Sequence, residues 1–315
     1  MKPKIAVLSA PSNLGLMPPA PGQEPGVRRM AAALKELGLL AQLGPGAYDA
    51  GEVAAPPYRP QRDPQTRVRN SAAVRDYALR LAAALEPLLA QGAFPLLLGG
   101  DCSILLGSML ALRRRGQFGL VFIDGHRDFQ TPQTSGTGGA AGMDLALVTG
   151  RGPQTLARLD GFERLVADEA VVVLGTRDAA PPELDGGRAI YETAITLLDL
   201  DDVRQNGPSG AAQRALAVLD VAAVEGFWIH LDVDVLDGEL MPAVDSPQPG
   251  GLTYEELAAL LAPLLTGHGV QGMQLTIYDP DLDPDGEVGW QLVDWLASLP
   301  LPVRRPGNHP RRPVI

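Results

Sequence analysis

Five residues with metal-binding side chains occur in two short clusters, and these are Asp124, His126, Asp128, Asp232 and Asp234. Within each cluster they alternate with other residues, so in an extended chain their side chains would point to the same side. Burying several carboxylates together is costly unless some are protonated or cations neutralise them. Two divalent cations would balance the charges of the four aspartates, and we therefore expect a two-metal site.

Both clusters follow short apolar segments of the kind that form buried strands. A third polar cluster, Gly99–Ser103, follows Phe94–Leu98 in the same way and contains Cys102, the only cysteine. Apolar strands separated by helical segments indicate a parallel sheet that is covered on both faces. Because ligands bind just outside the carboxyl ends of the strands in such sheets, we expect the three clusters to converge.

The remaining pattern predicts one α/β domain over residues 1–315, with three αβα layers around a mostly parallel sheet. The predicted strands are Ile5–Leu8, Phe94–Leu98, Leu120–Ile123, Val171–Leu174, Phe227–Leu231 and Met273–Tyr278. Four of the predicted helices are Val27–Leu37, Ser103–Arg115, Gln213–Val224 and Val288–Ser298. A fifth is capped by Asn70 or Ser71 and runs to about Leu89. A sixth begins at the capping box of Thr253 and ends near Leu265. The segment Pro45–Arg69 is rich in Pro, Gly and Gln, and it predicts a long surface loop.

Composition excludes several classes of protein. The formal net charge of −11 argues against nucleic acid or an anionic membrane as the partner, and favours a small molecule. A single cysteine cannot form an internal disulfide, which excludes a disulfide-stapled secreted scaffold. The N-terminal apolar run is too short for a signal peptide, and no apolar stretch approaches the roughly 20 residues of a membrane span. We therefore expect a cytoplasmic protein.

The polar clusters also carry a family resemblance. In this order along the chain, Gly99-Gly100-Asp101-Cys102-Ser103, Asp124-X-His126-X-Asp128 and Asp232-X-Asp234-X-X-Asp237 resemble the motifs of the ureohydrolases, which include arginase, agmatinase and formiminoglutamase. Further similar segments are Pro11–Gly15, Gly26–Arg28, Thr134–Gly136, Ala141–Met143, Ser246-Pro247 and Gly250–Thr253, so that the resemblance covers most of the chain. It implies an arginase-like fold, hydrolysis of a C–N bond in a linear amidine or guanidino compound, and a homo-oligomer, either a trimer or a hexamer.

The resemblance further implies two manganese ions bridged by a hydroxide that attacks the guanidinium or amidine carbon. The implied metal ligands are Cys102, Asp124, His126, Asp128, Asp232 and Asp234, with Asp124 and Asp232 bridging both ions, Asp128 and residue 102 on the first, and His126 and Asp234 on the second. The candidate catalytic residues are Asp124, Asp232 and His230. Asp237 would support the ligands from outside the first shell.

Residue 102 is a histidine in the well-known enzymes of this family and a cysteine here. Thiolate is a soft ligand, whereas manganese prefers oxygen and imidazole. The first site therefore holds a softer metal, binds manganese weakly through its carboxylates, or is empty and leaves a single ion at the second site. Cys102 is either a ligand or a small buried residue beside the pocket.

Three more positions depart from the family pattern. Ala141 replaces a histidine, Ile277 replaces the glutamate that pairs with the guanidinium, and His230 replaces a serine. His230 is either a hydrogen-bonded core residue or a catalytic one. The substrate therefore stays open, and Asp245, Asp279 or Asp281 could supply a replacement carboxylate. Two alternative functions follow, a non-hydrolytic metal- or ligand-binding protein and a deacetylase-like amidohydrolase.

Overall fold

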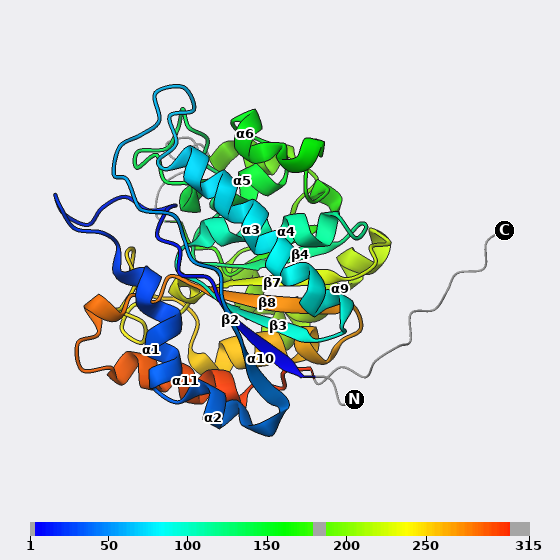
Figure 1. Cartoon of the computed structure of the whole chain (residues 1–315). Helices are drawn as coiled ribbons and strands as arrows, with labels where there is room; N and C mark the ends of the chain where they lie inside the picture. The colour runs from blue at the N-terminus through cyan, green and yellow to red at the C-terminus, as the bar shows by residue number, and fades with distance from the viewer. Residues whose placement is uncertain (1–3, 179–186, 303–315) are drawn as a thin grey trace.

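The computed structural model describes residues 4–178 and 187–302, and at its centre lies one eight-stranded sheet (Figure 1). Its strands are β1 (Ile5–Ser9), β2 (Ala47–Glu52), β3 (Phe94–Leu98), β4 (Gly119–Ile123), β5 (Val171–Leu174), β6 (Thr196–Leu198), β7 (Phe227–Asp232) and β8 (Val270–Thr276). They lie in the order β2-β1-β3-β8-β7-β4-β5-β6, and every pairing is parallel. The predicted parallel α/β fold is therefore confirmed.

Helices cover both faces of the sheet (Figure 1). One face carries α3 (Ser71–Ala90), α4 (Leu105–Arg113), α5 (Asp144–Val148) and α6 (Gln154–Ala157). The other carries α1 (Met30–Glu36), α2 (Leu39–Leu43), α8 (Leu200–Asn206), α9 (Pro208–Val221), α10 (Tyr254–Thr266) and α11 (Glu287–Ser298). Successive strand residues supply the two cores in turn: Leu97 packs under α3 and α4, whereas Leu96 and Leu98 pack toward the opposite helices.

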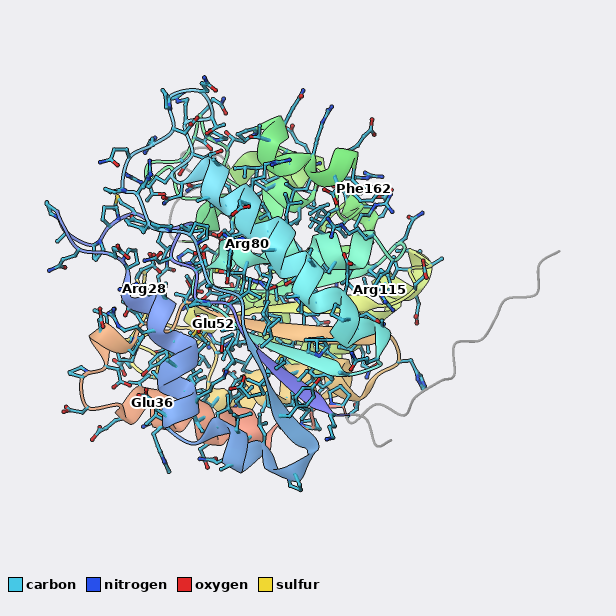
Figure 2. The ribbon with its side chains drawn as sticks, in the orientation of Figure 1. Arg28, Glu36, Glu52, Arg80, Arg115 and Phe162 are labelled. Carbon is cyan, nitrogen blue, oxygen red and sulfur yellow. The ribbon has the colours of Figure 1, made fainter. Side chains whose placement is uncertain are left out.

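Several local predictions are confirmed. Thr253 and Glu256 form the capping box that opens α10, with each side chain bonded to the other's backbone N–H. Gly38 follows α1 with φ 92°, a conformation that favours glycine. Charged side chains such as Glu36 and Arg80 project outward from the helices (Figure 2). Within the described residues, no helix is both long and apolar enough to cross a membrane.

Other local predictions are wrong. The segment Pro45–Arg69 is not one continuous loop, because it contains the edge strand β2. Every residue of β2 is half-buried or exposed, and the strand has no run of large apolar residues that would have indicated it. The edge strand β6 was missed because it has only 3 residues. Asn70 does not cap α3; its φ is 50°, and its amide bonds Leu14 O and the backbone N–H of Arg59 instead. Helix α9 begins at Pro208, before the predicted start.

Candidate metal centre

The turns that follow β3, β4, β7 and β8 share one device. In each, an aspartate accepts a hydrogen bond from the backbone N–H two residues later, at 2.9 Å for Asp101, 2.6 Å for Asp124, 2.8 Å for Asp232 and 2.9 Å for Asp279. This Asx turn occupies one carboxylate oxygen and ends the strand. The second oxygen remains available for another partner. For Asp124 that oxygen, Oδ2, is buried and has no hydrogen-bond partner among the described residues.

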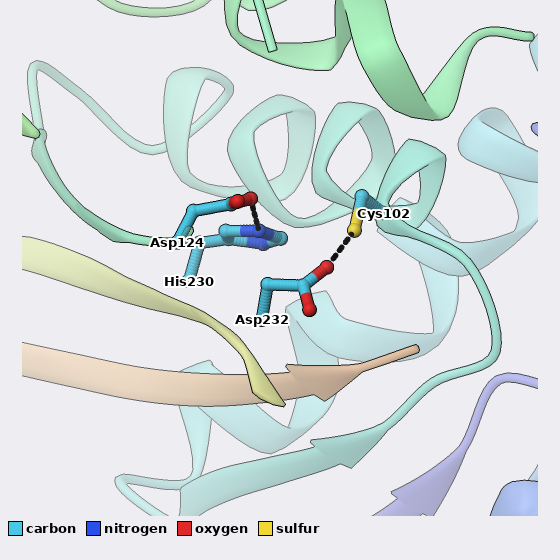
Figure 3. Close-up of side chains that lie close together, drawn as sticks. All are labelled: Cys102, Asp124, His230 and Asp232. Atoms are coloured by element: carbon cyan, nitrogen blue, oxygen red, sulfur yellow. Dashed lines mark hydrogen bonds and ion pairs between the residues drawn. The ribbon is translucent and has the colours of Figure 1, made fainter. Parts of the chain in front are cut away.

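One set of potential metal ligands, the Cys102 group, consists of Cys102, Asp124, His230 and Asp232 (Figure 3). One ligand atom from each lies within 4.8 Å of the others, and the four side chains are buried. Cys102 Sγ lies 2.7 Å from Asp232 Oδ2, and His230 Nε2 lies 3.7 Å from Asp124 Oδ2. The group joins residues from the ends of β3, β4 and β7, as expected for the carboxyl edge of a parallel sheet.

A second set, the His126 group, consists of Asp124, His126 and Asp234 and meets the same distance criterion. His126 Nδ1 lies 2.8 Å from Asp234 Oδ2 and 3.7 Å from Asp124 Oδ1. The other ring nitrogen, Nε2, lies 2.9 Å from the side-chain amide of Gln248. Asp124 belongs to both groups, so the two sets of potential ligands share one carboxylate.

Asp128 is placed differently from the other candidate ligands. It lines the same cavity but belongs to neither group. The chain is not extended here as predicted, because β4 ends at Ile123 and the following residues bend, with Asp128 at φ 44°. A role for Asp128 as a ligand of the first ion stays a prediction.

Burial and mutual repulsion dominate the electrostatics of the centre. Burial, with the neighbouring carboxylates, raises the pKa of Asp124, Asp128 and Asp232 well above the ordinary value of an aspartate. Burial alone would lower the pKa of His126, but Asp234 and nearby carboxylates raise it to about 10. Without a cation, the centre therefore retains protons near neutral pH. Divalent cations would replace them, so the donor set fits such ions.

His230 lies behind the cavity. Its side chain is fully buried, stacks on Phe122 with ring centroids 4.4 Å apart, and is not among the residues that line the cavity. Burial lowers its pKa to about 3, so the ring is neutral. The hydrogen-bonded core reading fits these contacts, and a catalytic role for His230 stays a prediction.

The two groups open into a cavity of about 1160 Å³. Its inner wall includes Cys102, Ala141 and Ile277, which are between 1% and 5% exposed. The φ of Ile277 is 78°, an unusual and strained conformation for a β-branched residue. The three candidate replacement carboxylates also line the cavity: Asp279 accepts a hydrogen bond from Gly26 N, Asp281 pairs with Arg29, and Asp245 is exposed.

The sequence did not predict a role for Asp144, Arg177 or Gln248, which the structure places near the candidate ligands. Asp144 is fully buried, and neither carboxylate oxygen has a partner among the described residues; burial raises its pKa, and it in turn raises the pKa of Cys102. Arg177 donates to the backbone carbonyls of residues 234, 235, 236 and 248, which holds the loop that carries Gln248. Only Asp144 had a signal, as a charged residue that directly follows Ala141–Met143 and precedes a fully apolar run.

Comparison with known proteins shows the family to which the chain belongs. The model of the arginase family matches residues 3–297. The chain belongs to the arginase family. The arginase of Bacillus caldovelox is 29% identical over 306 residues, which cover 95% of this chain and 98% of that protein. The arginase of Neurospora crassa is 29% identical over 300 residues, which cover 90% of this chain and 82% of that protein.

Solved structures show the same relationship for the fold. The native structure of arginase from Bacillus caldovelox has a TM-score of 0.83 and 28% identity, covering 95% of this chain and 98% of that one. Formimidoylglutamase from Bacillus subtilis has a TM-score of 0.69 at 18% identity, covering 96% and 89%, which is a likeness of fold alone. In this member of the arginase family, Cys102, Ala141 and Ile277 lie together among the residues that line the cavity.

Proposed function

We propose that this protein is a metal-dependent hydrolase that cleaves a C–N bond in a linear amidine or guanidino compound. The observation that carries the proposal is the pair of ligand groups that share the buried Asp124 and contribute Cys102, His126, Asp232 and Asp234 to the lining of the cavity. Membership of the arginase family supports the same reaction class. Both observations support hydrolysis of an amidino C–N bond, whereas the choice of substrate depends on the residues of the cavity wall.

The chemistry divides between the cations and the chain's own residues. When bound, two divalent cations would make hydroxide available near neutral pH for attack on the trigonal carbon. Asp124 holds the two ligand groups together, and its Asx turn with His126 N fixes its orientation. Asp234 orients His126 through Nδ1, and the side-chain amide of Gln248 contacts Nε2. The apolar wall at Ala141 and Ile277 favours a substrate whose reacting group is neutral or alkyl-substituted over a bare guanidinium.

We propose different metal preferences for the two groups. The His126 group offers imidazole and carboxylate oxygen, which suits manganese, the ion implied by the family resemblance. The Cys102 group includes a thiol, and a thiolate ligand favours zinc, iron or cobalt. If the thiol remains protonated against Asp232, the Cys102 group holds no ion and the protein has one ion per chain.

The test is metal content per chain, measured on protein purified without chelator, followed by an amidine and guanidino substrate screen with the metal found. Asp124→Ala should lose both ions and the turnover, because Asp124 belongs to both groups. Asp76→Ala, an exposed aspartate on α3, is the matched control and should retain both. Full hydrolysis by metal-free protein would refute the proposal.

The second candidate is a non-hydrolytic protein that binds metal or ligand on this scaffold. Ile277 and Ala141 favour it, because they leave the inner wall without a polar group at two positions. Metal-loaded protein that binds amidines without turnover would support this reading. A deacetylase-like reaction is third, since among the described histidines only His126 lines the cavity and no histidine pair is available for acid–base work.

By resemblance to the family, we also propose a homo-oligomer, a trimer or a hexamer, located in the cytoplasm. The proposed metal centre depends on neither the oligomeric state nor the location, because the residues of both ligand groups come from one chain. Sedimentation equilibrium on the metal-loaded protein distinguishes the two assemblies from a monomer by mass. Imaging of the tagged full chain in its native cell tests the location.

A further inference from the structure

Three buried side chains, those of Trp228, Gln274 and His230, form a series of hydrogen bonds that leads from the core toward Asp124, and we call this series the relay. Trp228 Nε1 donates to Gln274 Oε1 at 3.0 Å, and Ser108 Oγ donates to the same oxygen at 2.8 Å. The other end of the amide, Gln274 Nε2, lies 2.7 Å from His230 Nδ1. Trp228, Gln274 and His230 are all fully buried, so water does not compete for these bonds.

Trp228 determines which group donates and which accepts in each hydrogen bond of the relay. An indole N–H only donates, so the atom that faces it must be the amide oxygen. The amide nitrogen must therefore face His230, and it too can only donate. His230 Nδ1 then accepts and carries no proton, which leaves the single proton of the neutral ring on Nε2. Reversing the amide would set two donors against each other at Trp228.

The far side of the ring faces a carboxylate. His230 Nε2 lies 3.7 Å from Asp124 Oδ2, and neither atom has a hydrogen-bond partner among the described residues (Figure 3). A nitrogen that carries a proton cannot also offer a lone pair to a metal ion. We propose that Trp228 and Gln274 hold His230 in the Nε2–H tautomer, so that the Nε2–H group faces Asp124 Oδ2 and positions that carboxylate electrostatically, and His230 is not a metal ligand.

The packing around this relay keeps it in place. Phe122 stacks on the His230 ring with an angle of 18° between the planes, which restricts rotation of the imidazole. Gly272 makes room for Trp228, because a Cβ at that position would lie 2.3 Å from the indole ring. The consequence for metal binding rests on the proposed function, since it requires Asp124 to be a ligand. The tautomer itself does not, and it can be measured in metal-free protein.

The first test is ¹⁵N NMR of the imidazole side chains in the wild-type protein, metal-free and then loaded with zinc. The chain has 4 histidines, so single substitutions at the other three leave the His230 signals assigned. We expect Nδ1 to resonate as the unprotonated nitrogen and Nε2 as the protonated one in both states. An unprotonated Nε2, or an Nε2 signal that changes to a metal-bound one on loading, would overturn the proposal whatever the protein's activity.

The second test reverses the relay with Gln274→Glu. An ionised carboxylate at this position accepts from Trp228 and from a proton on His230 Nδ1, so the neutral ring then has its lone pair on Nε2, facing Asp124. We expect metal affinity to fall by about 10- to 100-fold, the usual cost of disturbing a residue that supports a ligand. Gln213→Glu on the exposed side of α9 is the charge-matched control and should not change affinity. If Gln274→Glu unfolds at the wild-type temperature and binds metal as tightly as the wild type or more tightly, His230 does not position Asp124. If this variant does not fold, the NMR measurement on the wild-type protein decides whether the proposed tautomer is correct.

Discussion

Cys102 Sγ and Asp232 Oδ2 lie 2.7 Å apart, although 130 residues separate them in the sequence. At this separation the two atoms share a proton or a cation. Burial and the adjacent Asp232 raise the pKa of the Cys102 thiol, which favours the shared proton when no metal is present. A metal ion at the Cys102 group must therefore displace that proton, and a soft ion does so more readily than manganese.

The variant Cys102→His tests this relationship. Imidazole in place of the thiol should raise the manganese content and lower the zinc preference of the Cys102 group, while the His126 group is unchanged. Metal analysis after equilibration with equimolar manganese and zinc measures the shift, and Cys102→Ser controls for loss of the thiol. Wild-type protein that already holds two manganese ions per chain would contradict the prediction.

The stability of metal-free protein should depend on pH through His126. Its folded-state pKa of about 10 exceeds the ordinary value of about 6.5. Protonated His126 therefore stabilises the folded state fully below pH 6.5, and this contribution is lost as the pH rises through 10. The aspartates with raised pKa act in the same direction. Thermal unfolding of chelator-treated protein should give a Tm that falls between pH 7 and 10.

Two comparisons make this pH prediction specific. His126→Asn should flatten the dependence, because it removes the group with the largest change in this range. Added divalent metal should restore stability most at high pH, since the ligands then have fewer protons to release. A Tm that rises steadily from pH 7 to 10 in metal-free protein would contradict the assignment.

Substrate preference should respond to Ile277. Its side chain lines the inner cavity wall and is 3% exposed, so it presents an apolar surface beside the metal centre. Ile277→Glu should raise kcat/KM for a guanidinium relative to a neutral amidine by about tenfold or more, which corresponds to about 1.4 kcal/mol. Ile277→Gln, uncharged and of similar size, separates charge from shape. Equal ratios for Glu and Gln would attribute any change to shape alone.

Gly100 should be intolerant of a side chain. A Cβ there would lie 1.7 Å from Ser12 O, and that oxygen accepts a hydrogen bond from Asp101 N. Gly100→Ala must displace backbone and with it Cys102, so we expect a loss of about 1–3 kcal/mol in the free energy of unfolding and weaker metal binding at the Cys102 group. Denaturant titration and metal analysis measure the two effects. Gly136→Ala, where nothing lies within 4 Å of the added carbon, is the control, and equal losses in both variants would refute the steric argument.

The sequence alone determined the central strands and the polar clusters at their ends. Strands such as β4 and β7 are buried on both faces, so their residues form continuous apolar runs that are visible without a structure. The edge strands β2 and β6 were not visible, because an exposed edge tolerates polar residues and short lengths. The close approach of Gly100 to the Ser12 backbone was not predicted, because it depends on a contact between segments far apart in the sequence.

Only the tertiary structure decided which candidate residues belong to the two ligand groups and which lie outside them. It placed Asp124 in both ligand groups, moved Asp128 out of them and buried Asp144 beside Cys102. His230 could not be assigned from its neighbours in sequence, because its partner Gln274 is 44 residues away and is itself oriented by Trp228. Strand periodicity reports which face a residue occupies, whereas the role of a buried polar side chain depends on which distant donor or acceptor the fold brings within hydrogen-bonding distance.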